Sequence, residues 1–310
     1  MPYVSVIIPV YNGETDLPEL IECLRSQTYM RDRVEYLLVD NNSGDRSFEM
    51  IKAAATAQPD QICLHPLQEN QIQSSYAARN TGIRAAKGTI LAFTDMDCRP
   101  EPQWLAELIQ PFDDGSIGIV AGEILALPGN SWLEDYADRQ ETLSQKHTLA
   151  NSYCAYGQTA NLAVRRTAFE QAGLFRPHLT TGGDADICWR IQQKTSYQLQ
   201  FAETAIVKHR HRSTLDELRR QWYRYGKSSR YLHQLHGVPL MKRLNTQDYL
   251  YRWGRWILKE LPRDSIKLLM GKADVVDVFN TPINLFTIQA RAKGQKESQL
   301  PESAREIEWL

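Results

Sequence analysis

The sequence lacks several features that would define its class at once. Its cysteines are few, five in 310 residues, and they are scattered without a CxxC pair. Such an odd, unpatterned set is typical of free thiols in a reducing compartment. No apolar run approaches the ~20 residues that a membrane-spanning helix needs. The run VSVIIPV near the amino end has no basic segment before it and is too short for a signal peptide. We therefore expect a cytoplasmic protein, which can still lie on a membrane surface.

The chain also lacks a strong charge of either sign. Its formal net charge is −1, so the whole molecule is neither a polycation nor an acidic-tail protein. We find no internal repeat and no low-complexity tract. The apolar fraction of 42% and the charged fraction of 24% are those of an ordinary globular protein. The length allows one large or two ordinary domains.

The first hundred residues alternate between strand and helix patterns. VSVIIPV at 4–10 is apolar on both faces, as expected of a central strand in a parallel sheet. The further elements that we predict here are a helix over 14–28, a strand over 34–39, a helix over 46–57, a short strand over 61–64, a helix over 74–87 and a strand over 88–94. This alternation favours right-handed βαβ units, in which ligands bind beyond the carboxyl ends of the strands.

The pattern loosens after residue 100. Strands are predicted over 117–121, 161–164 and 198–201. Ser131 and Glu134 form a capping-box pattern that opens a predicted helix to about residue 149. Further helices are predicted after Asp184 and, from a second capping box, after Thr214.

Two carboxylates follow the apolar strand ILAFT. Asp95 and Asp97, separated by one residue, repel each other unless a positive group lies near them. A divalent cation relieves that repulsion, because Mg²⁺ and Mn²⁺ prefer oxygen ligands and commonly bridge carboxylates to phosphates. The position after a buried strand indicates a clamp for a nucleoside diphosphate.

Positive charge is concentrated in residues 208–272, which hold 16 Lys and Arg against 5 Asp and Glu. Aromatic residues are interleaved, and Trp253, Trp256, Ile257 and Leu261 fall at helical spacing. A basic helix with Trp on its apolar side suits an anionic membrane surface. The alternative is a packed helix pair with a solvated basic face. Nucleic acid is not an expected partner, since no binding motif for it is present.

Six short motifs resemble those of family 2 glycosyltransferases with a GT-A fold, in the same order. They are VSVIIPVYN at 4–12, LLVDNNS at 37–43, ARNTGIRAAKG at 78–88, ILAFTDMD at 90–97, ANLAVRR at 160–166 and GGDADICWR at 182–190. VKHRHRST at 207–214 resembles the His-bearing segment that follows them in several members. The resemblance covers residues 3–215 and implies a mostly parallel central sheet flanked by helices.

The resemblance implies a nucleotide site at the strand ends. Pro9 and Tyr11 would line the base and ribose, and Asp40, with Asn42 in the same loop, would accept a hydrogen bond from the base. Uracil N3–H suits this acceptor, so UDP is favoured, although dTDP looks identical at that edge. Arg79 and Asp95 would lie near the diphosphate.

The resemblance also implies a divalent cation, Mn²⁺ or Mg²⁺, held by Asp97 and Asp95. His209 or His211 would complete the coordination, since neutral imidazole suits Mn²⁺. We favour His209.

Asp184 matches the catalytic base of the family. The usual pattern is Gly-Glu-Asp-x-Asp, and this chain has Gly183 in place of the Glu. Acceptor-side or sugar-side contacts are expected from the remaining matched positions: Asn161, Asp186, Trp189 and Arg190.

We therefore expect an inverting glycosyltransferase that moves a sugar from a nucleotide sugar to a hydroxyl of a saccharide or lipid-linked acceptor, in surface polysaccharide or glycolipid synthesis. A non-catalytic sugar-nucleotide-binding or scaffolding protein of the same fold is the alternative. The expected divisions are a GT-A domain over 1–215, with a nucleotide half over 1–100 and an acceptor half over 101–215, then a helical extension over 216–290 and a polar tail over 291–310. The expected location is the cytoplasm, peripherally on the inner face of the membrane.

Overall fold

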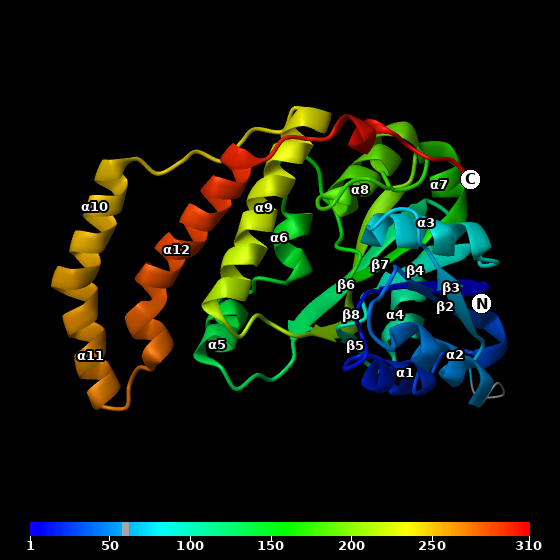
Figure 1. The fold of residues 1–310 in the computed structure, drawn as a ribbon, viewed down its shortest axis with the longest axis horizontal. Coiled ribbons are helices and arrows are strands. Elements are labelled where there is room, and N and C mark those ends of the chain that lie inside the picture. Colours follow the sequence, from blue (N-terminus) through cyan, green and yellow to red (C-terminus); the bar gives the residue numbers. More distant parts are fainter. Residues whose placement is uncertain (58–61) are drawn as a thin grey trace. The chain divides into compact units, whose positions relative to one another are not determined.

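The computed structural model describes residues 1–57 and 62–310, which divide into two compact units. Unit 1 comprises Met1–Ala126, Leu143–Arg210 and Pro301–Leu310. Unit 2 comprises Leu127–Thr142 and His211–Leu300. Both are drawn in Figure 1 and are described separately below.

Unit 1 is built on one mixed sheet of eight strands in the order β3-β2-β1-β4-β7-β6-β8-β5. The pairs β3-β2, β2-β1 and β1-β4 are parallel, whereas β7 runs antiparallel to both β4 and β6. The strands are β1 (Val4–Val10), β2 (Val34–Asp40), β3 (Leu64–Gln68), β4 (Ile90–Thr94), β5 (Cys98–Pro100), β6 (Ile117–Ala126), β7 (Asn161–Arg165) and β8 (Gln198–His209).

Helices cover both faces of this sheet. Alternate residues of β1 explain why: Val4, Val6 and Ile8 join one apolar cluster with residues of α1, α2 and α4, while Ile7 lies against the opposite helix α3. Figure 1 shows α1, α2 and α4 on one side and α3, α7 and α8 on the other. The helices of unit 1 are α1 (Leu17–Arg25), α2 (Ser47–Ala57), α3 (Ser75–Ala85), α4 (Trp104–Ile109), α6 (Gln145–Leu149), α7 (Arg166–Ala172) and α8 (Gly183–Lys194), with short 3₁₀ turns η1 (Arg31–Arg33), η2 (Gln110–Asp113) and η4 (Glu302–Arg305).

Unit 2 is helical. Its members are α5 (Trp132–Arg139), α9 (Leu215–His236), α10 (Thr246–Arg255), the π-helical turn η3 (Trp256–Glu260), α11 (Leu261–Leu269) and α12 (Val275–Glu297). Residues of α5, α9 and α12 share a small apolar core around Tyr136, Leu218 and Ile283. Both capping boxes read from the sequence, at Ser131 and Thr214, are present at the starts of α5 and α9.

Several elements differ from the sequence prediction; the strands predicted over 117–121 and 198–201, for example, extend to Ala126 and His209. The helix expected to reach residue 149 ends at Arg139, because Glu141 takes a positive φ of 47° and Ser144 caps a second helix, α6. The strand expected over 61–64 is found at Leu64–Gln68, and residue 61 lies outside the described residues. The segment expected to be a polar tail, 291–310, completes α12 to Glu297, and its last ten residues belong to unit 1.

The last ten residues are fixed in unit 1 by specific contacts. The backbone oxygen of Glu308 accepts a hydrogen bond from the Leu174 N–H at 2.8 Å. Its carboxylate accepts bonds from Asn80 and Arg84, at 2.9 and 2.7 Å. Ala304 is fully buried. A mainly polar composition therefore conceals an ordered segment.

Candidate active site

Polar side chains gather where β1, β2 and β4 end. The parallel register places Val10 opposite Asp40, so the loops after β1 and β2 leave the sheet at the same edge. These loops are hydrogen-bonded to each other, since the Asn12 N–H donates to Ser43 Oγ at 3.0 Å and the Gly44 N–H donates to Asn12 Oδ1 at 2.9 Å. The two loops at this edge of the sheet therefore hold each other in place.

Asp40 offers an acceptor that the protein does not use. The residue is buried, and its Oδ2 accepts a long bond of 3.4 Å from the Ser43 N–H. Its Oδ1 is buried without a hydrogen-bond partner among the described residues. An unpaired buried acceptor is costly, so a ligand N–H is a fitting partner for it. Nearby along the chain, Pro9 is buried in β1, whereas Tyr11 is 51% exposed and Asn42 is exposed with a φ of 61°.

Arg79 partners the first carboxylate of the pair after β4. Its guanidinium, on α3 and only 3% exposed, donates to Asp95 Oδ1 at 2.5 Å. The ring of Tyr76 lies 5.5 Å from the same guanidinium. Arg79 therefore balances the charge of Asp95 and ties α3 to the end of β4.

His209 lies beside the second carboxylate. Its Nε2 is 3.4 Å from Asp97 Oδ1, and with the Cys98 thiol these two groups could hold a metal ion. His209 Nδ1 lies 2.8 Å from the backbone oxygen of Arg210, which favours a proton on Nδ1 and leaves Nε2 as the ligand atom. The two carboxylates after β4 thus have different neighbours, a guanidinium for one and an imidazole for the other.

The donor set fits a divalent cation of the Mg²⁺ or Mn²⁺ type. Asp97 and His209 supply a carboxylate oxygen and an imidazole nitrogen, which Mn²⁺ accepts. Burial and the charges of Asp95 and Asp97 raise the pKa of the Cys98 thiol well above its ordinary value, which disfavours its thiolate form. The neighbouring Arg99 is occupied elsewhere, since it pairs with Asp16 at 2.6 Å and Glu19 at 2.7 Å.

Asp184 lies in the first turn of α8 and is fixed by a hydrogen bond. Thr159 Oγ1 donates to its Oδ1 at 2.8 Å. Burial raises the pKa of the Asp184 carboxyl, against the opposing effects of the Arg79 charge and the Thr159 bond, while the Asp95 charge adds to the rise. The charges of Arg79 and Asp95 thus both influence the Asp184 carboxyl.

Tyr76 explains why Gly183 occupies the position where the family pattern has Glu. The Tyr76 hydroxyl accepts a bond of 2.9 Å from the Gly183 N–H. A Cβ on Gly183 would lie 2.6 Å from the Tyr76 ring. Gly182, with a φ of 82°, turns the chain into the helix. In this chain an aromatic ring fills the space that a side chain at position 183 would need.

The four positions expected on the acceptor or sugar side are engaged in packing. Asp186 is fully buried between Arg176 and Arg190, with Nε–Oδ distances of 3.0 and 2.9 Å. Asn161, also fully buried, accepts from the Trp104 indole at 2.7 Å. Trp189 is 1% exposed and donates to the Cys154 backbone oxygen at 2.8 Å. We therefore leave Asn161, Asp186, Trp189 and Arg190 out of the proposed acceptor contacts.

His211 belongs to unit 2, so the site of unit 1 is described with His209 alone. Three residues of unit 1 were missed by sequence reasoning. Cys98 directly follows the DMD motif, Thr159 precedes the ANLAVRR motif by one residue, and Tyr76 lies two residues before ARNTG. In the sequence, only their position next to the motifs indicates that these three residues belong to the site.

Comparison with known proteins places this site in a family. The model of Glycosyl transferase family 2 matches residues 5–172, and that of Glycosyl transferase family group 2 matches residues 90–259. The chain is also 34% identical over 243 residues to glycosyltransferase AglE of Haloferax volcanii, an alignment that covers 78% of each protein. The chain therefore belongs to glycosyl transferase family 2.

Solved structures agree on the fold. The mannosyltransferase PcManGT from Pyrobaculum calidifontis, in complex with GDP-Man and Mn²⁺, superposes with a TM-score of 0.64 at 19% identity, over 96% of this chain and 88% of that one. S. aureus TarS 1–349 in complex with UDP-GlcNAc superposes with a TM-score of 0.56 at 14% identity, over 94% and 90%. The predicted GT-A fold is confirmed, with a sheet that is mixed beyond β4.

Proposed function

We propose that this glycosyltransferase moves a sugar from a nucleoside-diphosphate sugar, with UDP favoured, to a hydroxyl of its acceptor, with inversion at the anomeric carbon. The observation that supports this most is Asp184. It is a carboxylate fixed by Thr159 and influenced by the charges of Arg79 and Asp95. A general base must be placed and ionised in this way to accept a hydroxyl proton.

In the proposed reaction, Asp184 takes the proton of the acceptor hydroxyl while that oxygen attacks the anomeric carbon. The bond between this carbon and the diphosphate oxygen breaks, and its electron pair leaves with the nucleoside diphosphate. The raised pKa of Asp184 makes it a better proton acceptor than an ordinary carboxylate, provided that the pH keeps it ionised.

Asp97, Asp95 and His209 would hold the divalent cation, Mn²⁺ or Mg²⁺, whose chemistry is to neutralise the charge of the diphosphate. Asp40, with its unpaired Oδ1, would accept an N–H of the base, and Pro9, Tyr11 and Asn42 would surround the nucleoside. Arg79 would keep Asp95 in place.

The acceptor proposed is a saccharide or a lipid-linked saccharide, in surface polysaccharide or glycolipid synthesis. The excess of Lys and Arg in residues 208–272 supports a site of action at the inner face of a membrane, where such acceptors are found.

Calorimetric titration of UDP tests the donor half of the proposal. We expect binding with Mn²⁺ that is lost in EDTA, and a large loss in Asp97→Asn but not in the exposed control Asp32→Asn. dTDP and GDP are titrated in parallel, because Asp40 accepts from any base with a matching N–H. Release of nucleoside diphosphate from the matching sugar nucleotides is then measured. Binding without any turnover would favour the non-catalytic alternative, and no binding of any nucleotide would contradict the proposal.

A further inference from the structure

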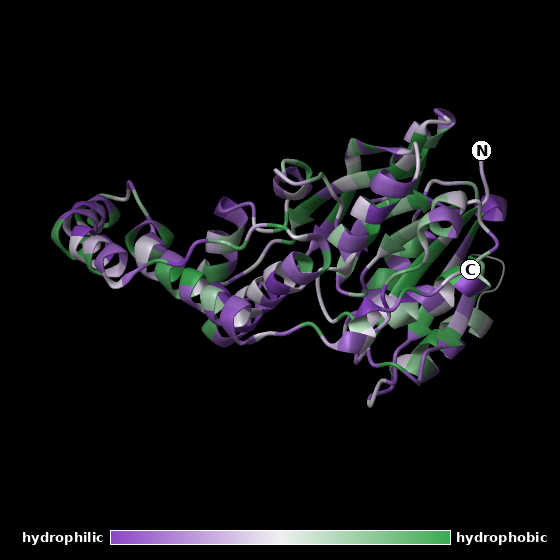
Figure 2. Cartoon of the chain, turned by 90° about the horizontal axis from the view of Figure 1, so that it is seen from above, coloured by the Kyte–Doolittle hydropathy of each residue, from purple (hydrophilic) through white to green (hydrophobic). Residues whose placement is uncertain are grey.

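Unit 2 exposes a long apolar surface on α10 and α11, which η3 joins end to end and which we call the helix pair. Leu258 and Leu269 are 83% and 89% exposed, and Leu250 is 68% exposed. Apart from Tyr251, which lines the cavity beside α12, six apolar side chains of this segment are more than half exposed, and we call them the docking face: Leu250, Ile257, Leu258, Ile266, Leu269 and Met270. Figure 2 shows hydrophobic positions, in green, along this ribbon. Exposed contiguous apolar surface of this kind marks an interaction site.

We propose that the docking face lies in the interface of an anionic phospholipid bilayer, parallel to the membrane plane. This deepens the proposed function by naming the surface through which unit 2 contacts the membrane. Among the described residues, no helix combines the length and apolarity needed to cross a bilayer. An amphipathic segment with basic residues can instead lie at the level of the headgroups.

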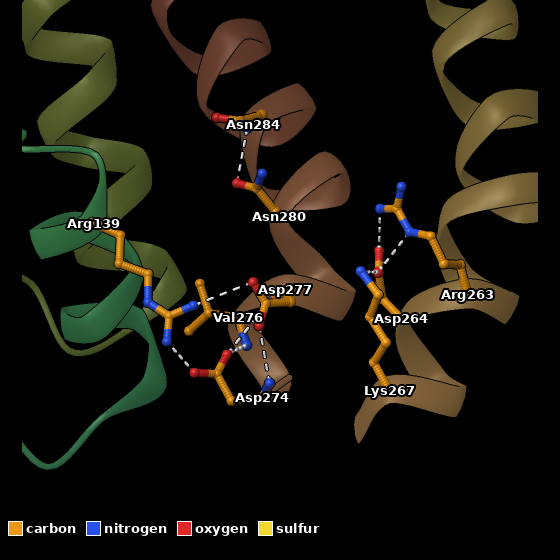
Figure 3. Close-up of polar contacts among 9 residues, drawn as sticks. All are labelled: Arg139, Arg263, Asp264, Lys267, Asp274, Val276, Asp277, Asn280 and Asn284. Carbon is orange, nitrogen blue, oxygen red and sulfur yellow. Dashed lines mark hydrogen bonds and ion pairs between the residues drawn. The ribbon is translucent and has the colours of Figure 1, made fainter. Parts of the chain in front are cut away.

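The polar side of the helix pair is turned toward α12. A cavity of about 660 Å³ separates them and is lined by charged residues of the pair and by Asn280 and Asn284 of α12. Arg255 pairs with Glu260 at 2.8 Å, and Arg263 pairs with Asp264 at 2.7 Å. Figure 3 shows the Arg263–Asp264 pair opposite the asparagines. The two acidic residues of η3 and α11 are therefore neutralised inside unit 2.

Trp256 fixes the rotation of the helix pair. Its indole donates to the Val278 backbone oxygen on α12 at 2.9 Å, and Trp253 packs edge-to-face against it at 5.4 Å. The sequence placed both Trp residues on one apolar side with Ile257. The π-helical turn η3 inserts wider spacing at this point, so regular α-helical spacing no longer holds across it. Ile257 and Leu258 are 51% and 83% exposed, while Trp256 anchors the segment to α12.

Positive charge remains available beside the docking face. Lys259 follows Leu258 directly and Lys272 comes two residues after Met270; both are exposed, and neither forms an ion pair or hydrogen bond with any residue in the described part of the chain. Apolar side chains flanked by unpaired cations complement a surface of anionic headgroups over an apolar interior. A protein partner would need an equally acidic and apolar surface, whereas an anionic bilayer supplies both.

Co-sedimentation of the full chain with vesicles tests the proposal. Vesicles of phosphatidylcholine alone are compared with vesicles that contain phosphatidylglycerol, at low and high salt. We expect binding that requires the anionic lipid and weakens with salt. Leu258→Glu/Leu269→Glu should partition at least ~30-fold more weakly, because two buried leucines are lost from the interface. The control Met30→Glu/Leu215→Glu changes two side chains of 49% and 48% exposure by the same charge and should bind as the wild type does.

A second variant separates the charge contribution. Lys259→Gln/Lys272→Gln removes two unpaired cations without adding charge, and we expect binding to fall ~10-fold or more at low salt with a shallower salt dependence. Both residues are exposed, so folding should be unaffected.

Two results would overturn the proposal. One is absence of wild-type binding to anionic vesicles at low salt. The other is a wild-type dimer, seen by analytical ultracentrifugation, that does not bind vesicles and is dissociated by Leu258→Glu/Leu269→Glu. That result would assign the docking face to a second copy of the chain. Nucleotide binding is measured on the same samples. Vesicle binding without nucleotide binding would support the docking face and contradict the transfer proposal, so the two can fail separately.

Discussion

Two regions of unit 1 contain the same pattern, an aspartate pair separated by one residue, and use it differently. After β4, Asp95 and Asp97 remain partly exposed, and each has a cationic or imidazole neighbour of its own. In the first turn of α8, Asp184 is bonded to Thr159, while Asp186 is fully buried between two arginines.

Backbone geometry accounts for the difference. Residues i and i+2 of an α-helix lie about 200° apart around the axis, so Asp184 and Asp186 must point in different directions. Asp95 and Asp97 lie instead in the short turn between β4 and β5, where two carboxylates can serve one ligand. The comparison teaches that a DxD pattern predicts shared function only outside a helix. In α8 the pair divides into Asp184, which we propose as the base, and Asp186, which is buried in ion pairs.

Replacing Asp184, the proposed base, should have the largest effect on transfer. Asp184→Asn keeps the shape of the side chain but cannot accept the acceptor proton, so we expect transfer to fall by about 10²–10⁴-fold. Nucleotide affinity should change little, since Asp184 makes no proposed contact with the nucleotide. Single-turnover transfer and UDP calorimetry check both statements. Near-normal turnover would remove Asp184 from the role of base.

Removing the packing carboxylate should instead affect stability. Asp186→Asn leaves Arg176 and Arg190 without their buried counter-charge, and breaking such a pair costs about 3–5 kcal/mol. At about 2–4 °C per kcal/mol for a chain of this size, Tm should fall by roughly 6–20 °C. The control Glu22→Gln, which breaks an exposed pair with Arg25, should cost less than ~1 kcal/mol. If Asp186→Asn abolished transfer with Tm unchanged, Asp186 would be returned to the acceptor side.

The contribution of Asp184 to folding stability should depend on pH. Its raised pKa means that the folded state binds this proton more tightly than the unfolded state does. The resulting stability is fully present below the ordinary carboxyl pKa, about 3.9, and is lost as the pH rises through the higher folded-state pKa. At neutral pH the ionised, desolvated carboxylate therefore disfavours folding, and Asp184→Asn should raise Tm there.

The measurement is Tm against pH for the wild type and for Asp184→Asn, with the pH profile of kcat/KM for the wild type. The Tm difference should shrink as the pH falls through the Asp184 pKa, and kcat/KM should fall over the same interval. An acid limb that lies at or below the ordinary carboxyl pKa would contradict the assignment.

Several strands and helix starts could be predicted from the sequence because the pattern that indicates each of them is local. β1, β2 and β4 follow mainly apolar runs, and the parallel register of these strands places Asp40 and Asp95 at or just after strand ends on one edge of the sheet. The capping boxes at Ser131 and Thr214 are likewise contained within four residues, and both are present in the structure.

Features that depend on distant partners could not be read in this way. Asp186 looks like a motif residue until Arg176 and Arg190 are found around it. Trp256 donates to the Val278 backbone oxygen on α12, and Glu308 orders a polar segment through Asn80 and Arg84. Apart from the i,i+4 pair of Asp186 and Arg190, these contacts join residues that are far apart in the sequence.

The smallest expected effect concerns the residue that joins the two regions. Tyr76 lies against Arg79, which pairs with Asp95, and its hydroxyl accepts the Gly183 N–H beside Asp184. Tyr76→Phe keeps the ring and its stacking on Phe175 but leaves the Gly183 N–H without this acceptor, which loosens the first turn of α8. We expect kcat to fall ~3–10-fold with UDP affinity unchanged and with a shifted acid limb of the pH profile. If Tm changed while kcat and the acid limb of the pH profile stayed the same, Tyr76 would have a structural role alone. Only a residue that positions Asp184 would alter proton transfer when its phenol oxygen is removed.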